Sequence, residues 1–281
     1  MKCLLTFLFN LFILFSWSQQ FSGSFYGGYQ FGVGKQNLEH HSVNDFLNWE
    51  PWVWEKVDLS LGQGAQVSAN LFYDINPNYG FTLNGSYLFG SEFSSRVKYT
   101  DITYERTLSG TMMRISPSFR MYVGSNKIRS YTEIGFVLGI GKINYSFSGY
   151  SGDSTILGYE YLYDGGVAFG ATAKFGVEFR LTDRVQLFGE FNFISQAYAP
   201  EKGILTDYVI DNENAMHYFE DNPNGISIEF VEELQIDPTI SPEPNEPVKR
   251  AKHSYPFHSY GFNVGVKFIL WTKKKEESST S

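Results

Sequence analysis

The strongest constraint on the fold is a stretch of strict two-residue periodicity between Val167 and Ser195. In its first half, apolar residues occupy every second position, and polar residues or glycines fill the positions between them. The apolar set is Phe169, Ala171, Ala173, Phe175, Val177, Phe179 and Leu181. After the short polar segment 182–184 the alternation resumes, with Phe188 as its exception. Because successive side chains of a strand point to opposite faces, the stretch predicts a β-hairpin with one apolar and one polar face.

The strands of this hairpin are long, and their polar face mixes Lys, Glu and Arg with Gly. Strands in soluble sheets usually have about five or six residues, whereas a strand of a membrane-spanning barrel needs about 9–11. Such a barrel turns its apolar face to lipid and its polar face to the lumen. A soluble β-sandwich with one solvated face has the same alternation, so the hairpin alone leaves both architectures open.

The N-terminus has the features of a secretory signal peptide. Lys2 precedes a short apolar run, which ends in small residues around Ser18. We expect residues 1–18 to be removed, with a cut as late as Gln20 as the alternative. The only cysteine, Cys3, lies within this segment, before its apolar core. The mature chain is therefore expected to have no thiol, no disulfide and no cysteine-based metal site.

Two further observations restrict the class of protein. No later run approaches the roughly 18–20 apolar residues that a transmembrane helix requires, so any membrane-spanning part must consist of strands. The formal net charge is −8 and no basic stripe is present, which argues against a nucleic-acid partner.

About eight alternating segments follow one another along the mature chain. Short turns join some of them, at 74–78, 125–127 and 182–184. Long polar excursions join the others, at about 35–60, 91–110, 145–163 and 197–254. A soluble sandwich has no reason to gather its long loops at one end, whereas an outer-membrane barrel has short periplasmic turns and long extracellular loops. The sequence therefore predicts an all-β fold, a closed antiparallel up-and-down transmembrane β-barrel.

This prediction fixes the boundaries of the domains. Residues 21–271 form the barrel, and residues 272–281 form a polar tail. An outer-membrane barrel has both termini in the periplasm, and we expect the same of this chain.

The last predicted strand carries a pattern of polar, glycine, aromatic and apolar residues at Asn263, Gly265, Phe268 and Leu270. This pattern resembles the C-terminal signal by which outer-membrane barrels are recognised for assembly. The mature chain as a whole resembles the small OmpA/OmpX-type barrels, particularly the Phe-, Tyr- and Asn-rich ones of Bacteroidota. The resemblance implies a monomer in the bacterial outer membrane, in contact with its lipid and with the barrel-assembly machinery. It implies little about activity, because function resides in sites grafted on folds.

Charged residues on the polar faces of the predicted strands are expected in the lumen. They are Arg114, Arg120, Glu133, Lys174, Glu178, Arg180, Glu190 and Lys267. An eight-stranded barrel is just wide enough for side chains to fill its interior, and burying an unpaired charge there is costly. We interpret the set as a packed salt-bridge network. A narrow or gated channel lined by the same residues is the alternative.

The excursions hold the other candidate ligands. Candidate metal ligands are His40, His41, Asp207, Asp211, Glu213, His217, Glu220 and Asp221. Oxygen-rich loops can hold Ca²⁺, but the segment 211–214 does not fit a twelve-residue calcium loop, which has Gly at its sixth position and Glu at its twelfth. We therefore expect a solvated acidic loop, without metal or cofactor. Some outer-membrane hydrolases use Asp and His near the loop rim, but no catalytic motif accompanies these residues here.

The first excursion contains three clustered tryptophans, Trp49, Trp52 and Trp54. Tryptophan clusters can anchor a partner or a carbohydrate, because aromatic residues dominate binding hot spots. The plainer interpretation is an aromatic girdle at the level of the lipid headgroups. In the last excursion, Ile226, Ile228 and Phe230 predict an extended piece, either in an extracellular hairpin or in an extra strand pair of a ten-stranded barrel.

Three functions are compatible with these features. The first, which the sequence favours, is a non-enzymatic barrel with a largely closed lumen and long loops, for envelope integrity, adhesion or surface interaction. The second is a narrow pore for small solutes. The third is a hydrolase whose catalytic residues lie in the loops.

Overall fold

The computed structural model describes eight stretches of the chain: 20–34, 36–42, 54–99, 101–125, 127–152, 154–219, 225–234 and 246–272. Several predictions fall outside these residues. They concern the signal peptide, Trp49, Trp52, Glu220, Asp221 and the tail beyond residue 272.

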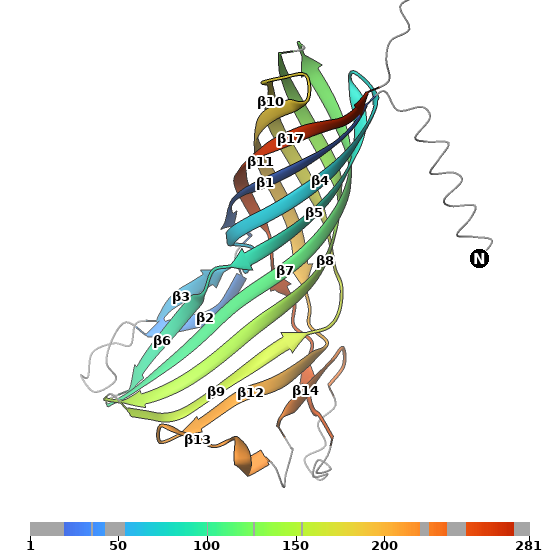
Figure 1. Ribbon diagram of the computed structural model, residues 1–281. Helices are drawn as coiled ribbons and strands as arrows, with labels where there is room; N and C mark the ends of the chain where they lie inside the picture. Colours follow the sequence, from blue (N-terminus) through green and yellow to red (C-terminus); the bar gives the residue numbers. More distant parts are fainter. Residues whose placement is uncertain are drawn as a thin grey trace, which may run out of the picture.

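Eight antiparallel strands close into a ring (Figure 1). In order around the ring they are β1 (Gln20–Gly32), β4 (Gly64–Asn76), β5 (Tyr79–Gly90), β7 (Ile102–Gly124), β8 (Ile128–Ser151), β10 (Ala168–Arg180), β11 (Val185–Tyr198) and β17 (Ser259–Thr272). Each strand pairs with the next one, and β17 pairs with β1 to complete the ring. The predicted closed antiparallel up-and-down barrel is confirmed.

The ring is apolar outside and polar inside. On β10, Phe169 and Phe175 point outward and are 72% and 57% exposed. Their neighbours Thr172, Lys174 and Glu178 point inward and are at most 5% exposed. The same alternation runs along the other ring strands, as in β4 and β5. The two-residue period therefore sorts apolar residues to the outer wall and polar residues to the interior.

The two ends of the ring differ, as predicted. Short turns join β4 to β5, β7 to β8 and β10 to β11 at one end. In the first of them, Asn76 Oδ1 accepts hydrogen bonds from the backbone N–H groups of Asn78 and Tyr79, each at 2.8 Å, which fixes the turn. The termini of the ring lie at this end too, because Gln20 pairs with Thr272. The long connections all lie at the other end.

Strands β7 and β8 have 23 and 24 residues and continue beyond the ring, where further strands extend the same sheet (Figure 1). There β7 pairs with β6 (Phe93–Tyr99), and β8 pairs with β9 (Ser154–Asp164). The sheet continues through β12 (Lys202–Ile210) and β14 (Ser227–Val231) to β15 (Val248–Ala251), which runs parallel to β14. We call these strands, with residues 102–110 of β7 and 143–151 of β8, the extension sheet.

The extension sheet corrects part of the sequence prediction. The excursions 91–110 and 145–163 were predicted only as polar connections outside the eight barrel strands, but they consist mostly of strands that extend two of those strands beyond the ring. Their Ser, Thr and Gly residues resemble loop composition, while the pairing that makes them a sheet depends on strands distant in the sequence. The predicted extended piece around Ile228 is confirmed as β14, which pairs outside the ring. The ring thus has eight strands rather than ten.

The remaining elements are not strands of the ring wall. They are β2 (Gln36–Ser42) and β3 (Trp54–Leu59), which form a separate hairpin, β13 (Glu213–Asn214), β16 (Tyr255–Pro256) and the 3₁₀ helix η1 (Met216–Phe219). Within the described residues, no helix is long and apolar enough to cross a membrane.

Two glycines of the ring test this inside–outside arrangement. A Cβ at inward-facing Gly265 would lie 2.6 Å from the Phe25 carbonyl oxygen and 2.8 Å from the Phe188 ring, whereas one at outward-facing Gly189 would meet nothing within 4 Å. We expect Gly265→Leu to cost about 1–3 kcal/mol or more through overpacking, and Gly189→Leu to stay within about 0.5 kcal/mol of wild type. Urea unfolding of the refolded barrel measures both. Equal loss in the two variants would contradict the arrangement.

Candidate functional site in the polar interior of the ring

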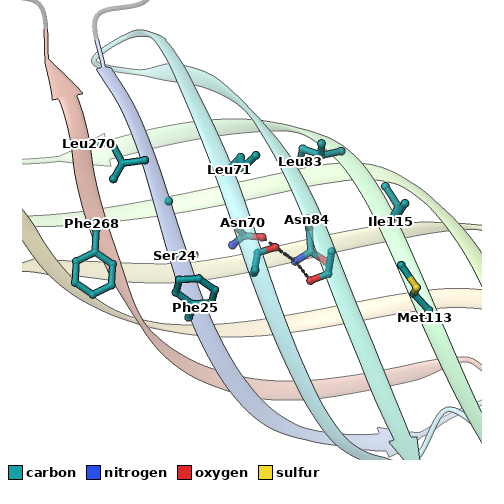
Figure 2. Close-up of a pocket in the computed structure, with 13 residues that line it drawn as sticks. Ser24, Phe25, Asn70, Leu71, Leu83, Asn84, Met113, Ile115, Phe268 and Leu270 are labelled. Atoms are coloured by element: carbon teal, nitrogen blue, oxygen red, sulfur yellow. Dashed lines mark hydrogen bonds between the residues drawn. The ribbon is translucent and has the colours of Figure 1, made fainter.

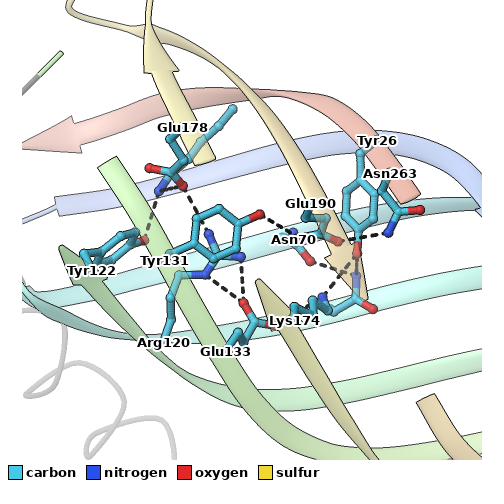
Figure 3. Close-up of polar contacts among 12 residues, drawn as sticks. Tyr26, Asn70, Arg120, Tyr122, Tyr131, Glu133, Lys174, Glu178, Glu190 and Asn263 are labelled. Atoms are coloured by element: carbon cyan, nitrogen blue, oxygen red, sulfur yellow. Dashed lines mark hydrogen bonds and ion pairs between the residues drawn. The ribbon is translucent and has the colours of Figure 1, made fainter. Parts of the chain in front are cut away.

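The interior of the ring near the short-turn end is filled by ion pairs. Glu133 on β8 accepts from Arg120 Nε on β7 at 2.7 Å through its Oε2 atom. Its other oxygen lies 3.1 Å from Lys174 Nζ on β10. All three side chains are almost completely buried. The carboxylate therefore holds together three consecutive strands of the ring (Figure 3).

A second carboxylate, Glu178 on β10, receives three cations. Its Oε1 atom lies 3.1 Å from Arg120 Nη1 and 3.2 Å from Lys267 Nζ, which comes from β17. Its Oε2 atom lies 2.7 Å from Nη2 of Arg129 on β8. Arg120 thus bridges Glu133 and Glu178, and the two carboxylates form one continuous network.

Aromatic rings complete the surroundings of these cations. The Arg120 guanidinium lies between the rings of Phe72 and Tyr131, 4.3 and 4.0 Å from their centroids. Lys267 Nζ lies 4.2 Å from the centroid of Phe72. A cation over a ring face is attracted by the ring quadrupole, most strongly where water is excluded. The aromatic rings therefore stabilise these buried cations.

Tyrosine and amide groups extend the network to the remaining strands of the ring. Tyr131 Oη donates to Glu190 on β11 at 2.7 Å, and Asn263 on β17 donates to the other oxygen of Glu190 at 3.0 Å. Lys174 donates to Tyr26 Oη on β1 at 3.3 Å, and Asn84 on β5 donates to the same oxygen at 2.8 Å. Figure 3 shows these contacts converging on the centre of the ring.

The charges of the network balance. Its cations are Arg120, Arg129, Lys174 and Lys267, and its carboxylates are Asp74, Glu133, Glu178 and Glu190. Asp74 enters through Tyr122, whose hydroxyl donates to it at 3.1 Å and accepts from Lys267 at 3.1 Å. Four positive and four negative groups leave no net charge, which is the condition under which buried ions are tolerated.

Two residues of the predicted network lie apart from it. Arg114 is 1% exposed, yet its hydrogen-bond partners are neutral: Gln196 Oε1 at 3.0 Å, Gln66 Oε1 at 3.4 Å and the Phe257 carbonyl oxygen at 3.5 Å. Arg180 is half-buried at the end of β10, and its Nε has no hydrogen-bond partner among the described residues. The alternation along a strand predicts that a side chain faces the interior, but it does not predict the position of that side chain along the axis of the ring. Neither arginine forms an ion pair with the carboxylates of the network.

Between Arg114 and the end of the ring that carries the long connections, an apolar plug fills the interior. Leu61 follows β3 and Phe257 follows β16, and both are fully buried. A hydrogen bond from the backbone N–H of Leu61 to the Pro256 carbonyl, at 2.8 Å, joins their two segments across the mouth. Around them lie buried apolar residues of the ring and the extension sheet: Leu59, Leu88, Leu108, Met112, Ile143, Tyr163, Ala168, Tyr198 and Ile228.

Sequence reasoning missed part of this interior. The turn predicted at 74–78 includes Asp74, and neither Tyr131 nor Arg129 is among the residues predicted to face the lumen. Following the inward parity back by two and four positions from Glu133 would have found both. The exception in the alternation, Phe188, lies inside the ring, 5.6 Å from Tyr26 between ring centroids and beside Gly265.

The four residues of the C-terminal pattern divide between the two faces of β17. Asn263 points inward to Glu190, and Gly265 makes room for Phe188. Phe268 and Leu270 point outward and are exposed. Recognition of this pattern for assembly stays a prediction.

The other candidate residues are scattered over the long connections. Trp54 begins β3, and His40 and His41 lie on β2. Asp211 forms, with Asn212, the two-residue turn between β12 and β13, where both have positive φ angles of 50° and 66°. Asp207 Oδ1 accepts from Asn214 at 3.2 Å. In the described part of the chain, no three His, Cys, Asp or Glu side chains gather into a group that could hold a metal ion.

No protein-family model matches the chain, and no curated protein matches it. Among solved structures it is similar to Ail, the attachment invasion locus protein of Yersinia pestis (TM-score 0.28, 11% identity, 89% of this chain and 99% of that one). It is similar also to Acinetobacter baumannii CarO2 (TM-score 0.31, 11% identity, 88% and 98%). Likeness at these TM-scores supports no further conclusion. The closed ring, apolar outer wall and polar interior are themselves the features of a small outer-membrane β-barrel.

The shared carboxylate allows a test of the network. We expect Glu178→Gln to destabilise the barrel by about 3–5 kcal/mol, because it leaves Arg129 and Lys267 without their carboxylate. Lys267→Met in the same chain removes one of these cations and should restore part of the loss. Urea unfolding of the two single variants and the double variant forms a double-mutant cycle. Additive losses would show that Glu178 and Lys267 do not interact.

Proposed function

We propose that this protein is a closed, non-conducting β-barrel of the bacterial outer membrane that holds the extension sheet at the cell surface. The observation that carries the proposal is the filled interior. A neutral ion network occupies the short-turn half of the ring, and the apolar plug occupies its other end. In this proposal the barrel has no catalytic role, and its termini lie in the periplasm.

The outer wall supports the membrane location. Every strand of the ring has large apolar residues exposed on its outer face, for example Phe25, Val67, Phe81, Met113, Phe136, Phe169, Phe191 and Val264. Soluble monomers rarely expose continuous apolar surface beyond a few hundred Å². A wall of this kind all around a closed ring is the arrangement that lipid requires, because closure leaves no unpaired strand edge.

The interior supports a closed barrel over a pore. An ion crossing the ring would have to break pairs such as Arg120–Glu133, in which both partners are buried. It would also have to pass Leu61 and Phe257, which offer no polar group to replace its water. Each step is costly, so the narrow-pore alternative finds no support in this arrangement.

The extension sheet supports a role in surface interaction. Aromatic side chains gather on the face that continues the ring interior. Phe147 on β8 stacks between Tyr104 on β7 and Tyr159 on β9, with ring centroids 5.8 and 4.9 Å apart. Arg106 and Arg250 lie over rings of the same row, those of Phe147 and Tyr161. Aromatic residues and arginine are enriched in binding hot spots.

Planar-bilayer recording tests the closed barrel. We expect the refolded wild-type protein to show no stable single-channel openings, because the charge network and the plug fill the ring. Co-flotation with liposomes and a heat-dependent shift on a gel serve as controls that the same preparation is folded and inserted. Stable openings from inserted protein would favour the narrow pore instead.

Cysteine labelling tests the orientation. We expect Glu160→Cys, on exposed β9, to react with a membrane-impermeant maleimide on intact cells. Asp183→Cys, in the exposed short turn between β10 and β11, should react only after the outer membrane is permeabilised. The unsubstituted chain is the background control. The reverse pattern would place the extension sheet in the periplasm.

A further inference from the structure

The segment that carries Phe257 into the plug joins β11 at a break in the strand pairing. The pairing of β11 with β17 ends at Ile194, and the pairing of β11 with β16 begins at Ala197. Between them, the backbone carbonyl of Gln196 accepts from the N–H of Phe257 at 2.9 Å. The backbone N–H of Gln196 has no strand partner at this break.

The imidazole of His258 fills this gap in the ladder. Its Nδ1 atom accepts from the backbone N–H of Gln196 at 3.0 Å and lies 3.3 Å from Ser195 Oγ. A backbone N–H can only donate, so Nδ1 is the unprotonated nitrogen of a neutral ring and Nε2 carries the proton. The hydrogen bond that closes the break therefore requires a neutral His258.

The same residue is tied to the other half of the plug. The backbone carbonyl of His258 accepts from Ser60 Oγ at 2.7 Å, directly before Leu61, and from the N–H of Val33 at 3.1 Å. Leu61 in turn donates to the Pro256 carbonyl. Loss of the bond between His258 and Gln196 would thus loosen both segments of the plug from β11.

No charged group near His258 favours its protonated form. The half-buried imidazole lies between β11 and the end of β1. A Cβ at Gly34 would lie 3.0 Å from its Cδ2 atom, and Ser195 and Gln196 approach its Nδ1 atom. None of these neighbours titrates, and no carboxylate of the described residues acts on the ring. The state of the imidazole is therefore set by solution pH and by the Gln196 hydrogen bond.

Elsewhere in the interior an amide performs the role of acceptor. Asn70 Oδ1 accepts from Asn84 Nδ2 at 2.7 Å (Figure 2). An amide oxygen accepts at any pH, whereas a histidine nitrogen accepts only while the ring is neutral. The use of histidine at the break makes this one attachment sensitive to pH.

We propose that His258 is a latch that holds the plug segment 255–258 on β11 at neutral pH and releases it in acid. Protonation places an N–H on Nδ1 opposite the N–H of Gln196, so the hydrogen bond is lost and two donors face each other. A released segment takes up the proton without this obstacle. The attachment is therefore complete above about pH 6.5 and weakens as the pH falls through the range in which histidine titrates.

A spin label on the refolded mature protein tests the latch by electron paramagnetic resonance. The label is attached through Ser254→Cys, an exposed position directly before β16. Between about pH 7.5 and about pH 5, the ratio of mobile to immobile label should rise about fivefold or more, as expected for the loss of one hydrogen bond. The change should reverse at neutral pH. A label on Asp183→Cys, in the short turn, should keep its line shape.

His258→Asn separates protonation from hydrogen bonding. The asparagine amide oxygen can accept from Gln196 but does not titrate, so the label at position 254 should stay immobile down to about pH 5. His253→Asn is the matched control, because His253 flanks β16 on its other side, is exposed and contacts Tyr255. It should keep the wild-type response. His258→Gln is the second variant, used if His258→Asn fails the gel-shift criterion.

The outcomes separate the latch from the proposed function. An immobile label at both pH values in the wild type would overturn the latch. So would an unchanged acid response in His258→Asn, or its loss in His253→Asn. None of these results bears on the closed lumen, because the ion network fills the ring whether or not the plug is attached. Stable single-channel openings at neutral pH would instead contradict the proposed function and leave the label to decide on the latch.

Discussion

The structure depends on the compensation of charge inside a narrow ring. Glu133 and Glu178 lie where water is largely excluded, and an unpaired carboxylate there would cost far more than its pair gains. Arg120 joins them, and tyrosine and amide groups carry the contacts on to every strand of the ring. Soluble proteins stabilise their centre by apolar burial, but here the apolar residues face outward. Polar satisfaction has to hold the interior together instead.

The same constraint explains why the interior changes along its axis. Where carboxylates and cations balance, the ring is filled by ions. Arg114 marks the transition, because its guanidinium finds only amide and carbonyl oxygens. Beyond it the chain fills the mouth with apolar side chains such as Leu61 and Phe257. The plug packs in turn against the inner face of the extension sheet, so this sheet rests on the filled barrel.

Sequence reasoning reached the ring because lipid and lumen impose a strict alternation. The alternation alone predicts that Phe169 and Phe175 face outward and that Lys174 faces inward, without information about the neighbouring strands. It failed where the outcome depends on distant pairing. The stretch from Tyr145 to Tyr163 resembles a polar loop until β8 and β9 pair beyond the ring. The height of Arg114 and Arg180 along the axis depends on the registers of all eight strands, which local periodicity does not encode.

The glycines of the ring differ in whether the packing of the interior explains their small size. Inside the ring, Gly176 and Gly265 accommodate the rings of Tyr131 and Phe188, so the interior accounts for them. On the outer wall, Gly85 faces open space, and a larger apolar residue there would extend the lipid contact of the wall. Outward-facing Gly189 is equally open, and neither packing within the ring nor backbone conformation accounts for the small size of these two residues.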